Sequence, residues 1–277
     1  MNIVETLEKQ REFFSSGKTR PVEFRLNQLR TLKQAIKDHE KQIMEGLASD
    51  LAKSEFETYE TEIGNTYQEI NFACKNLRKW IKPEKVKTPL TILPSRSFIY
   101  TEPRGTSLII GPWNFPFQLI MIPLLGSIAA GNTSIVKPSE VAAATSKILA
   151  ELIGKTFPKE YIAVFEGGAQ IAKELLSNKF DIIFFTGGTK IGCEVAEFAA
   201  RNLTPTILEL GGKSPCIVDL NTNLQITARR IVWGKFLNAG QTCIAPDYLL
   251  VHRSEKTTLL TKMKQQIVQL FGNDPSK

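Results

Sequence analysis

Apolar residues recur every three or four positions along two runs, Phe24–Leu51 and Glu55–Ile81, with Glu and Lys in the positions between them. This spacing is typical of amphipathic helices. His39 is then expected on the surface of the first helical run and Cys74 on the core side of the second. The N-terminal part of the chain is therefore predicted to be helical.

The helical pattern ends at a group of prolines, Pro83, Pro89 and Pro94. Apolar and polar residues alternate from Leu90 to Tyr100, which is typical of a hairpin or a strand-like linker. We therefore expect an extended arm between the helices and the next part of the chain.

From Thr106 onward, short apolar runs alternate with helical ones. The expected strands are Thr106–Ile110, Thr133–Val136, Ile162–Phe165, Asp181–Phe185 and Thr206–Leu208. The expected helices between them are Pro116–Ala130, Glu140–Ile153, Ala169–Leu176 and Gly192–Ala200. Because these strands are apolar almost throughout, the alternation predicts a parallel sheet with helices on both of its faces.

The same alternation starts again after Gly211. The expected elements there are a strand Cys216–Val218, a helix Leu224–Leu237, a strand Tyr248–His252 and a helix Glu255–Phe271. Two strands are too few for an independently stable sheet. The second α/β unit is therefore expected to be incomplete.

The composition is that of a folded globular chain, with 277 residues of which 42% are hydrophobic and 23% charged. The formal charge of +7 is spread out, since basic residues alternate with acidic ones, as between Lys33 and Glu45. A nucleic-acid-binding protein gathers its basic residues into a stripe or arm, so nucleic acid is not expected as a partner. The surplus favours at most a weak attraction for small anions such as a dinucleotide.

No targeting or membrane-spanning segment is expected. Met1–Arg11 contains acids and has no apolar core, unlike a secretory signal. The most apolar stretch, Phe117–Ala130, is shorter than the roughly 20 residues that cross a bilayer, and it predicts a buried helix. We therefore expect a cytoplasmic protein with reduced cysteines and, because no two of them form a CxxC pair, no metal ion. The four thiols are Cys74, Cys193, Cys216 and Cys243.

Ligands of open α/β sheets bind beyond the carboxyl ends of the strands. Thr186–Gly192 follows a predicted strand and opens a helix, so its backbone N–H groups and the positive end of the helix dipole suit a phosphate. The segment is neither GxGxxG nor a P-loop, and a tight turn without a ligand is the alternative. Lys137 and Glu140 follow another strand, where they suit the hydroxyls of a ribose; the alternative is a helix start with Ser139 as its cap.

Cys243 lies in a loop between Gly240 and Pro246 and is the candidate nucleophile. A catalytic cysteine usually takes a histidine as its base. The chain has only His39, in a charged helix, and His252, in an apolar strand, so a cysteine–histidine pair is not expected.

A carboxylate is the better candidate for the base. Glu209 interrupts an apolar strand end just before a double glycine. Partial desolvation there would raise its pKa and suit it to general-base work near neutral pH. The alternative is a structural pair between Glu209 and Lys213. Cys74, Cys193 and Cys216 lack comparable surroundings and are predicted to be packing residues.

Asn114 is a polar amide among aromatic residues in the segment Gly111–Phe117, at another strand end. Its NH₂ group can donate to a developing oxyanion in a dry pocket. A turn cap is the alternative role.

Five segments, in this order and at this spacing, resemble the NAD(P)-dependent aldehyde dehydrogenases, and Ala239–Tyr248 looks most like the class-3 and fatty aldehyde dehydrogenase branch. The segments are Gly111–Phe117, Lys137–Glu140, Phe185–Gly192, Glu209–Pro215 and Gly240–Tyr248. The resemblance implies an α/β fold with a Rossmann-type parallel cofactor sheet. The implied parts are N-terminal helices (1–82), a bridging arm (83–105), a dinucleotide-binding domain (106–211) and the beginning of a catalytic domain (212–277).

The resemblance also implies oxidation of an aldehyde to a carboxylic acid with NAD or NADP, through a thiohemiacetal and a thioester of cysteine. It implies Cys243 as nucleophile, Glu209 as general base and Asn114 as oxyanion donor. It places Gly187 and Gly192 at the pyrophosphate, and Lys137 with Glu140 at the adenosine ribose. The implied cofactor-binding residues are Trp113, Lys137, Glu140, Thr186, Gly187, Gly188, Thr189, Lys190, Ile191 and Gly192.

Members of this family are longer than 277 residues, and the additional part holds the nicotinamide ribose and the strand used for oligomerisation; full-length relatives are expected to be homodimers. The chain alone is therefore expected to be a poor catalyst. Two functions stay open, an aldehyde-oxidising enzyme and a shortened chain that binds dinucleotide at most. A variant that releases the thioester to coenzyme A is disfavoured by the presence of Glu209.

Overall fold

A computed structural model describes residues 2–274 of the chain. The chain divides into two compact units, Met1–Glu209 and Leu210–Lys277, and each is described by itself. The first unit contains a five-stranded sheet with the order β5-β4-β3-β6-β7. Its strands are β3 (Thr106–Ile110), β4 (Thr133–Lys137), β5 (Ile162–Val164), β6 (Ile182–Gly187) and β7 (Thr206–Leu210).

The strand order starts in the middle of the sheet. The chain runs outward from β3 through β4 to β5 and then returns to the other side of β3 with β6 and β7. The pairs β3–β4, β3–β6 and β4–β5 are parallel. The direction of winding therefore reverses between β3 and β6, which is where doubly wound sheets bind their ligands.

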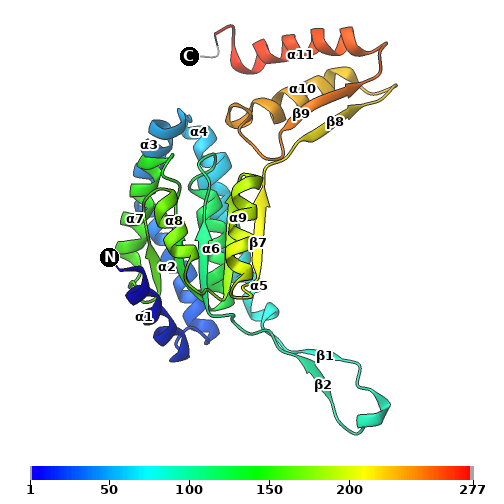
Figure 1. The fold of residues 1–277 in the computed structure, drawn as a ribbon. Coiled ribbons are helices and arrows are strands. Elements are labelled where there is room, and N and C mark those ends of the chain that lie inside the picture. Colours follow the sequence, from blue (N-terminus) through cyan, green and yellow to red (C-terminus); the bar gives the residue numbers. More distant parts are fainter. Residues whose placement is uncertain (1, 275–277) are drawn as a thin grey trace. The chain divides into compact units, whose positions relative to one another are not determined.

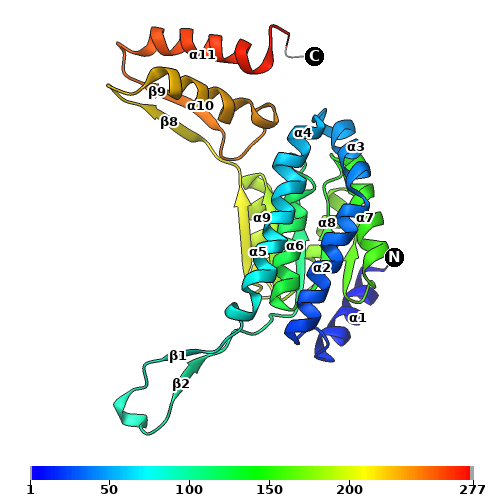
Figure 2. The same cartoon turned by 180° about the vertical axis from the view of Figure 1, so that it is seen from behind.

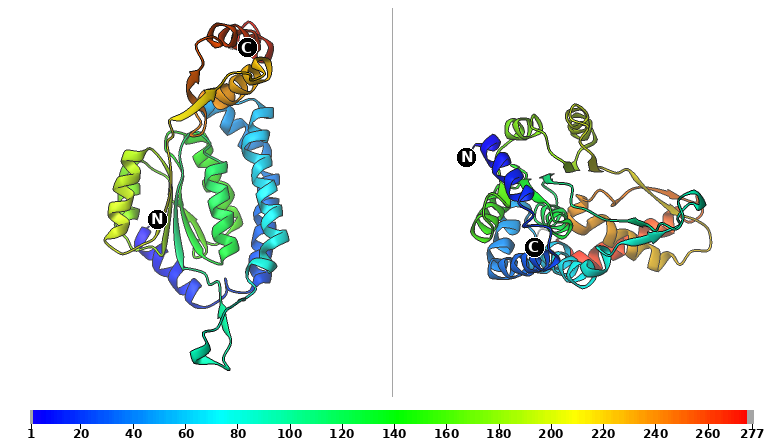
Figure 3. Two further views of the ribbon diagram at one scale, coloured as in Figure 1. Left: turned by 90° about the vertical axis from the view of Figure 1, so that its right-hand side faces the viewer. Right: turned by 90° about the horizontal axis from the view of Figure 1, so that it is seen from below.

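Helices cover both faces of this sheet, as predicted. Figure 3 shows α9 (Thr189–Ala200) on the face opposite to α6 (Gln118–Ala130) and α7 (Ala143–Thr156). α8 (Ala169–Leu176) packs against α9. The N-terminal helices α2 (Val22–Asp38), α3 (Glu40–Leu51) and α5 (Gly64–Trp80) form an outer layer over α6 and α7 (Figure 2). The other elements before α5 are α1 (Ile3–Ser15), the short helix α4 (Glu55–Thr58) and a π-helical turn η1 (Tyr59–Ile63).

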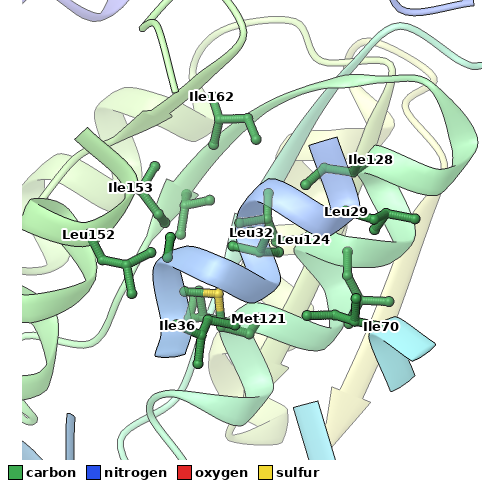
Figure 4. Close-up of a cluster of buried hydrophobic side chains, with 14 of the residues drawn as sticks. Leu29, Leu32, Ile36, Ile70, Met121, Leu124, Ile128, Leu152, Ile153 and Ile162 are labelled. Atoms are coloured by element: carbon green, nitrogen blue, oxygen red, sulfur yellow. The ribbon is translucent and has the colours of Figure 1, made fainter. Parts of the chain in front are cut away.

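The main core fills the space between the sheet and these outer helices (Figure 4). α6 lies in the middle of it, and this explains why its sequence is apolar on nearly every side. The predicted buried helix at 117–130 is therefore confirmed. Among residues 2–274 no helix is both long enough and apolar enough to cross a bilayer. Fully buried members of the core include Leu29, Leu32, Ile36, Ile70, Met121, Leu124, Ile128, Leu152, Ile153 and Ile162.

The arm is a hairpin that projects away from the helices of the first unit (Figure 1). Its strands are β1 (Glu84–Val86) and β2 (Ser97–Ile99), paired antiparallel. The hairpin is confirmed, but the segment predicted to be extended, Leu90–Tyr100, includes a turn of 3₁₀ helix at η2 (Leu90–Ile92) and contributes only its last part to a strand. Local alternation did not distinguish a strand from the tip of the hairpin.

The second unit contains two parallel strands, β8 (Ser214–Val218) and β9 (Pro246–Val251). Between them come α10 (Leu224–Phe236) and η3 (Leu237–Gly240), and α11 (Lys256–Phe271) follows β9. Its small core consists of Val218, Ala228, Ile231 and Leu259, with partly buried neighbours.

Candidate functional site

The carboxyl ends of β3, β4 and β6 lie side by side at the point where the winding reverses. Ile110, the last residue of β3, pairs with Lys137 on one side and with Phe185 on the other. The Gly111 N–H continues the ladder and donates to the Lys137 carbonyl at 3.1 Å. The structure therefore brings three of the predicted segments, those of Asn114, Lys137 and Thr186, to one sheet edge.

Lys137 and Glu140 form an ion pair at this edge, with 2.6 Å between Nζ and Oε2. The Lys137 side chain is 5% exposed and that of Glu140 47%. Burial alone would raise the pKa of Glu140, but the hydrogen bond and charge of Lys137, with a backbone hydrogen bond, outweigh it and hold this pKa below its ordinary value. The pair thus presents a charged carboxylate to solvent beside a buried ammonium group.

Glu140 does not lie in a helix. The alternative interpretation of Ser139 as a helix cap is wrong, because α7 begins only at Ala143. Its first-turn N–H groups, those of Ala144 and Thr145, donate to the Asp50 carboxylate at 3.1 and 2.7 Å. A capping residue 94 positions away in the sequence thus sets the start of this helix, and local patterns cannot reveal it.

The helix α9 begins directly after the glycine-rich turn. Gly188 is the N-cap residue, and no side chain caps the helix there. A Cβ atom added at Gly188 would meet nothing within 4 Å, whereas one at Gly187 would lie 2.5 Å from the Phe185 ring. The helix begins at Thr189, earlier than the predicted Gly192, because the glycines end the turn sooner than the pattern indicated.

The remaining predicted cofactor residues differ in exposure. Thr189, Lys190 and Ile191 are exposed on the first turn of α9, and Trp113 is exposed after β3, whereas Gly192 is buried. The Thr186 hydroxyl oxygen is buried and has no hydrogen-bond partner among residues 2–274. Buried polar atoms are normally satisfied, so this hydroxyl at the strand end is available to a ligand.

Glu209 is exposed near the end of β7. The desolvation predicted for this carboxylate is therefore not found in the described chain. β7 is one of the two edge strands of the sheet, and Ile207, two residues earlier on the same face, is also exposed at 45%. The alternative pairing of Glu209 with Lys213 stays a prediction; within the second unit, Lys213 Nζ lies 3.2 Å from Asp247 Oδ2.

Cys243 lies in the second unit and is exposed. Asn238, Ala239 and Gly240 precede it in three consecutive left-handed conformations, with φ of 52°, 52° and 79°. Such a run is costly for residues other than glycine and is typical of functional loops. The side-chain amide of Gln241 donates to the Asn238 carbonyl at 3.0 Å and holds the turn together.

Gly212, from the double glycine noted in the sequence, packs against the same loop. A Cβ atom at this position would lie 2.2 Å from the Cys243 carbonyl oxygen, so only glycine fits. The second glycine of the double glycine thus allows the backbone to pack closely against the loop that contains the candidate nucleophile.

All four cysteines are free in the structure. Cys74 and Cys216 are half-buried, and burial raises the pKa of both thiols. Cys193 is exposed on α9, so its predicted role in packing is wrong. The buried face of α9 contains Gly192, Val195 and Ala199, and Cys193 lies off that face.

One ion pair of buried charged residues was not predicted from the sequence. Lys53 and Glu62 form an ion pair within the first unit, with side chains 2% and 0% exposed. Their sequence signal was weak, since both lie among many Lys and Glu residues of amphipathic helices.

Comparisons with known proteins agree with this architecture. The chain is 46% identical to 4,4'-diaponeurosporen-aldehyde dehydrogenase of Staphylococcus aureus, over 99% of this chain and 60% of that protein. It is 44% identical to aldehyde dehydrogenase family 3 member A2 of Macaca fascicularis, a class-3 relative, over 97% of this chain and 55% of the relative.

Solved structures show the same fold. The substrate-bound state of Staphylococcus aureus AldH has a TM-score of 0.97 and 45% identity, and the match covers 100% of this chain and 61% of that one. A betaine aldehyde dehydrogenase from Staphylococcus aureus, solved in complex with NAD⁺, has a TM-score of 0.86 and 26% identity over 97% of this chain and 53% of that one.

The chain thus spans about 53–61% of the length of these relatives. Residues 2–277 match the model of the aldehyde dehydrogenase family. Together with the sheet order and the motifs at its carboxyl edge, this match shows that the chain belongs to the aldehyde dehydrogenase family.

Proposed function

We propose that this chain carries the cofactor-binding and nucleophile-bearing parts of an enzyme that oxidises aldehydes to carboxylic acids with NAD(P)⁺. The observation that carries the proposal is the edge at the β3–β6 reversal. An uncapped helix N-terminus, the Lys137–Glu140 pair and the buried hydroxyl of Thr186 lie together there.

The residues of the first unit fit a dinucleotide. The first-turn N–H groups of α9 suit the pyrophosphate, and the open space at Gly188 lets it approach the backbone. Glu140 suits the hydroxyls of the adenosine ribose, with Lys137 holding its carboxylate in place. The Thr186 hydroxyl is free to bind a polar group of the ligand. These features do not separate NAD from NADP, because Glu140 repels a 2′-phosphate and Lys137 offsets that repulsion.

The chemistry begins at Cys243, whose thiolate attacks the aldehyde carbonyl carbon and forms a thiohemiacetal. The Asn114 amide and the Cys243 N–H donate hydrogen bonds to the resulting oxyanion. Bound NAD(P)⁺ supplies the hydride acceptor. Loss of hydride from the adduct leaves a thioester on Cys243, and Glu209 then takes a proton from the water that hydrolyses it to the carboxylic acid.

Two alternative functions stay open beside this proposal. The first is a chain that binds a dinucleotide without turnover, which the coverage of about 53–61% of its relatives' length keeps open. The second is transfer of the thioester to a thiol such as coenzyme A, against which the carboxylate of Glu209 argues. Cytoplasmic location and homodimeric assembly stay predictions.

The test is rapid mixing of NAD⁺, a simple aldehyde and the protein, with NADH absorbance as the signal. It uses the 277-residue chain and, in parallel, any longer protein that contains it. Where turnover occurs, Cys243→Ala should abolish it, and Glu209→Gln should give one burst of NADH per site followed by slow hydrolysis. Normal turnover of Glu209→Gln would exclude Glu209 as the base.

Binding is measured separately by calorimetry with NAD⁺ and NADP⁺. Binding without a burst in any form would favour the non-catalytic alternative. No binding of either dinucleotide at millimolar concentration, to protein shown to be folded, would refute the proposal.

A further inference from the structure

The Lys53–Glu62 ion pair is buried within the first unit, with 2.5 Å between Lys53 Nζ and Glu62 Oε1. Removing two charges from water costs several kcal/mol per ion, and an apolar pair of similar volume is often equally stable or more stable. A gain in folding stability is therefore a weak explanation for the presence of this buried ion pair. Its contacts indicate another reason.

The second oxygen of Glu62 accepts two backbone hydrogen bonds at the start of α6. The N–H groups of Phe117 and Gln118 donate to Oε2 at 2.9 and 3.1 Å. A carboxylate at a helix N-terminus also interacts favourably with the helix dipole. Burial raises the pKa of the Glu62 carboxyl above its ordinary value, against the opposing effects of Lys53 and the two N–H donors.

Lys53, the other member of the ion pair, contacts the segment that leads into α6. Its ammonium nitrogen lies 4.2 Å from the centre of the Phe115 ring, and Phe115 is itself only 8% exposed. A desolvated cation–π contact of this kind is attractive and directional. Residues 115, 117 and 118 are thus all held by two side chains from more than fifty positions earlier in the chain.

The backbone around Glu62 is also unusual. Glu62 lies in the π-helical turn η1 (Tyr59–Ile63), between α4 and α5. Such turns are rare and are frequent at functional sites. In this turn Thr61, Glu62 and Ile63 are all buried, so the turn directs a carboxylate into the interior of the first unit.

We propose that Lys53 and Glu62 are positioning residues that fix the loop Gly111–Phe117, so that the Asn114 amide is held at the carboxyl end of β3. The β3 end of the loop is held by the Gly111–Lys137 backbone bond, and its α6 end by Glu62 and Lys53. Asn114 lies between these two anchors. The catalytic consequence rests on the proposed function, in which Asn114 donates to the oxyanion.

The test compares Glu62→Gln and Lys53→Met with the control Leu175→Ala in the ¹⁵N-labelled chain. Leu175 is fully buried on α8, so the control lowers stability without touching the loop. The readouts are amide exchange across 111–121 and the NMR signals of the Asn114 side-chain NH₂, assigned by their loss in Asn114→Asp. These readouts do not depend on turnover.

We expect exchange of the Phe117 and Gln118 amides to speed up on the order of ten- to a hundredfold in Glu62→Gln, because a neutral amide with one acceptor oxygen replaces a charged carboxylate with two. The Asn114 NH₂ signals should move in both variants and stay in place in the control. Should Glu62→Gln fail to fold, Lys53→Met and Phe115→Leu carry the test, because both leave the two bonds from the α6 backbone to Glu62 in place.

Asn114 signals that stay in place in the folded variants, with exchange no faster than in the control, would overturn the positioning role. In a form that turns over, Glu62→Gln should lower kcat and leave the KM for NAD⁺ unchanged. Absence of turnover in every wild-type form that contains this chain would favour the non-catalytic alternative to the proposed function, while the NMR and exchange results would still decide the role of the pair.

Discussion

The four cysteines have different surroundings, and these predict an order of reactivity. Cys193 and Cys243 are exposed, whereas Cys74 and Cys216 are half-buried with raised thiol pKa values. Burial slows alkylation in two ways. It restricts the access of the reagent to the sulfur, and it lowers the fraction of thiolate, which is the reactive form. At pH 7.5, iodoacetamide should label Cys193 and Cys243 on the order of ten times faster than the other two.

Peptide mass spectrometry over a time course measures the four rates. All four rates should converge in denaturant, which serves as the control. As the pH rises, the labelling rate of Cys216 should increase by a larger factor than that of a thiol with an ordinary pKa, because the raised pKa of Cys216 leaves more thiol to ionise. Early labelling of Cys74 or Cys216 in native protein would contradict the burial seen here.

At the scale of elements, substitutions in the turn before α9 distinguish a turn that only connects two elements from a turn that binds a ligand. Gly188→Ala adds a methyl group that meets nothing within 4 Å, so folding should be unaffected. A pyrophosphate on the α9 N-terminus would be crowded by this methyl group, and NAD⁺ affinity should fall by roughly tenfold or more. Gly187→Val should bind still less, because its Cβ lies 2.5 Å from the Phe185 ring.

Gly154→Ala on α7 is the matched control, since its added methyl group also meets nothing within 4 Å. Calorimetric titration with NAD⁺ measures all three variants. Unchanged affinity in Gly188→Ala would mean that the turn only connects β6 to α9.

At the scale of the whole molecule, the two units differ in how much core each contains. The first is built on a large cluster between the sheet and the helices, whereas the second has only a small cluster. One face of its two-stranded sheet leaves Ile217 71% and Leu250 51% exposed. Protection against hydrogen exchange should therefore be strong across 106–209 and weak across 214–271.

Exchange followed by mass spectrometry on the 277-residue chain tests this difference. A urea titration should then show the second unit losing structure first. Equal protection of both units, with a single cooperative transition, would contradict this prediction.

Local patterns along the sequence predicted most elements of the chain. The alternation of short apolar runs with helical ones located all five strands of the main sheet and both strands of the second unit, because periodicity depends on nearest neighbours. The same alternation predicted that Asn114, Lys137 and Thr186 lie at strand ends. Parallel strands then bring such residues to one edge.

Tertiary structure alone decided which distant residues meet. Asp50 caps α7, Glu62 anchors α6 and Gly212 packs against the Cys243 loop, each across a separation that no periodicity spans. The exposure of Glu209 was likewise decided by the place of β7 at the edge of the sheet. The physical reason is that a side chain's own sequence window encodes its helix or strand, whereas its burial and partners depend on which elements pack beside it.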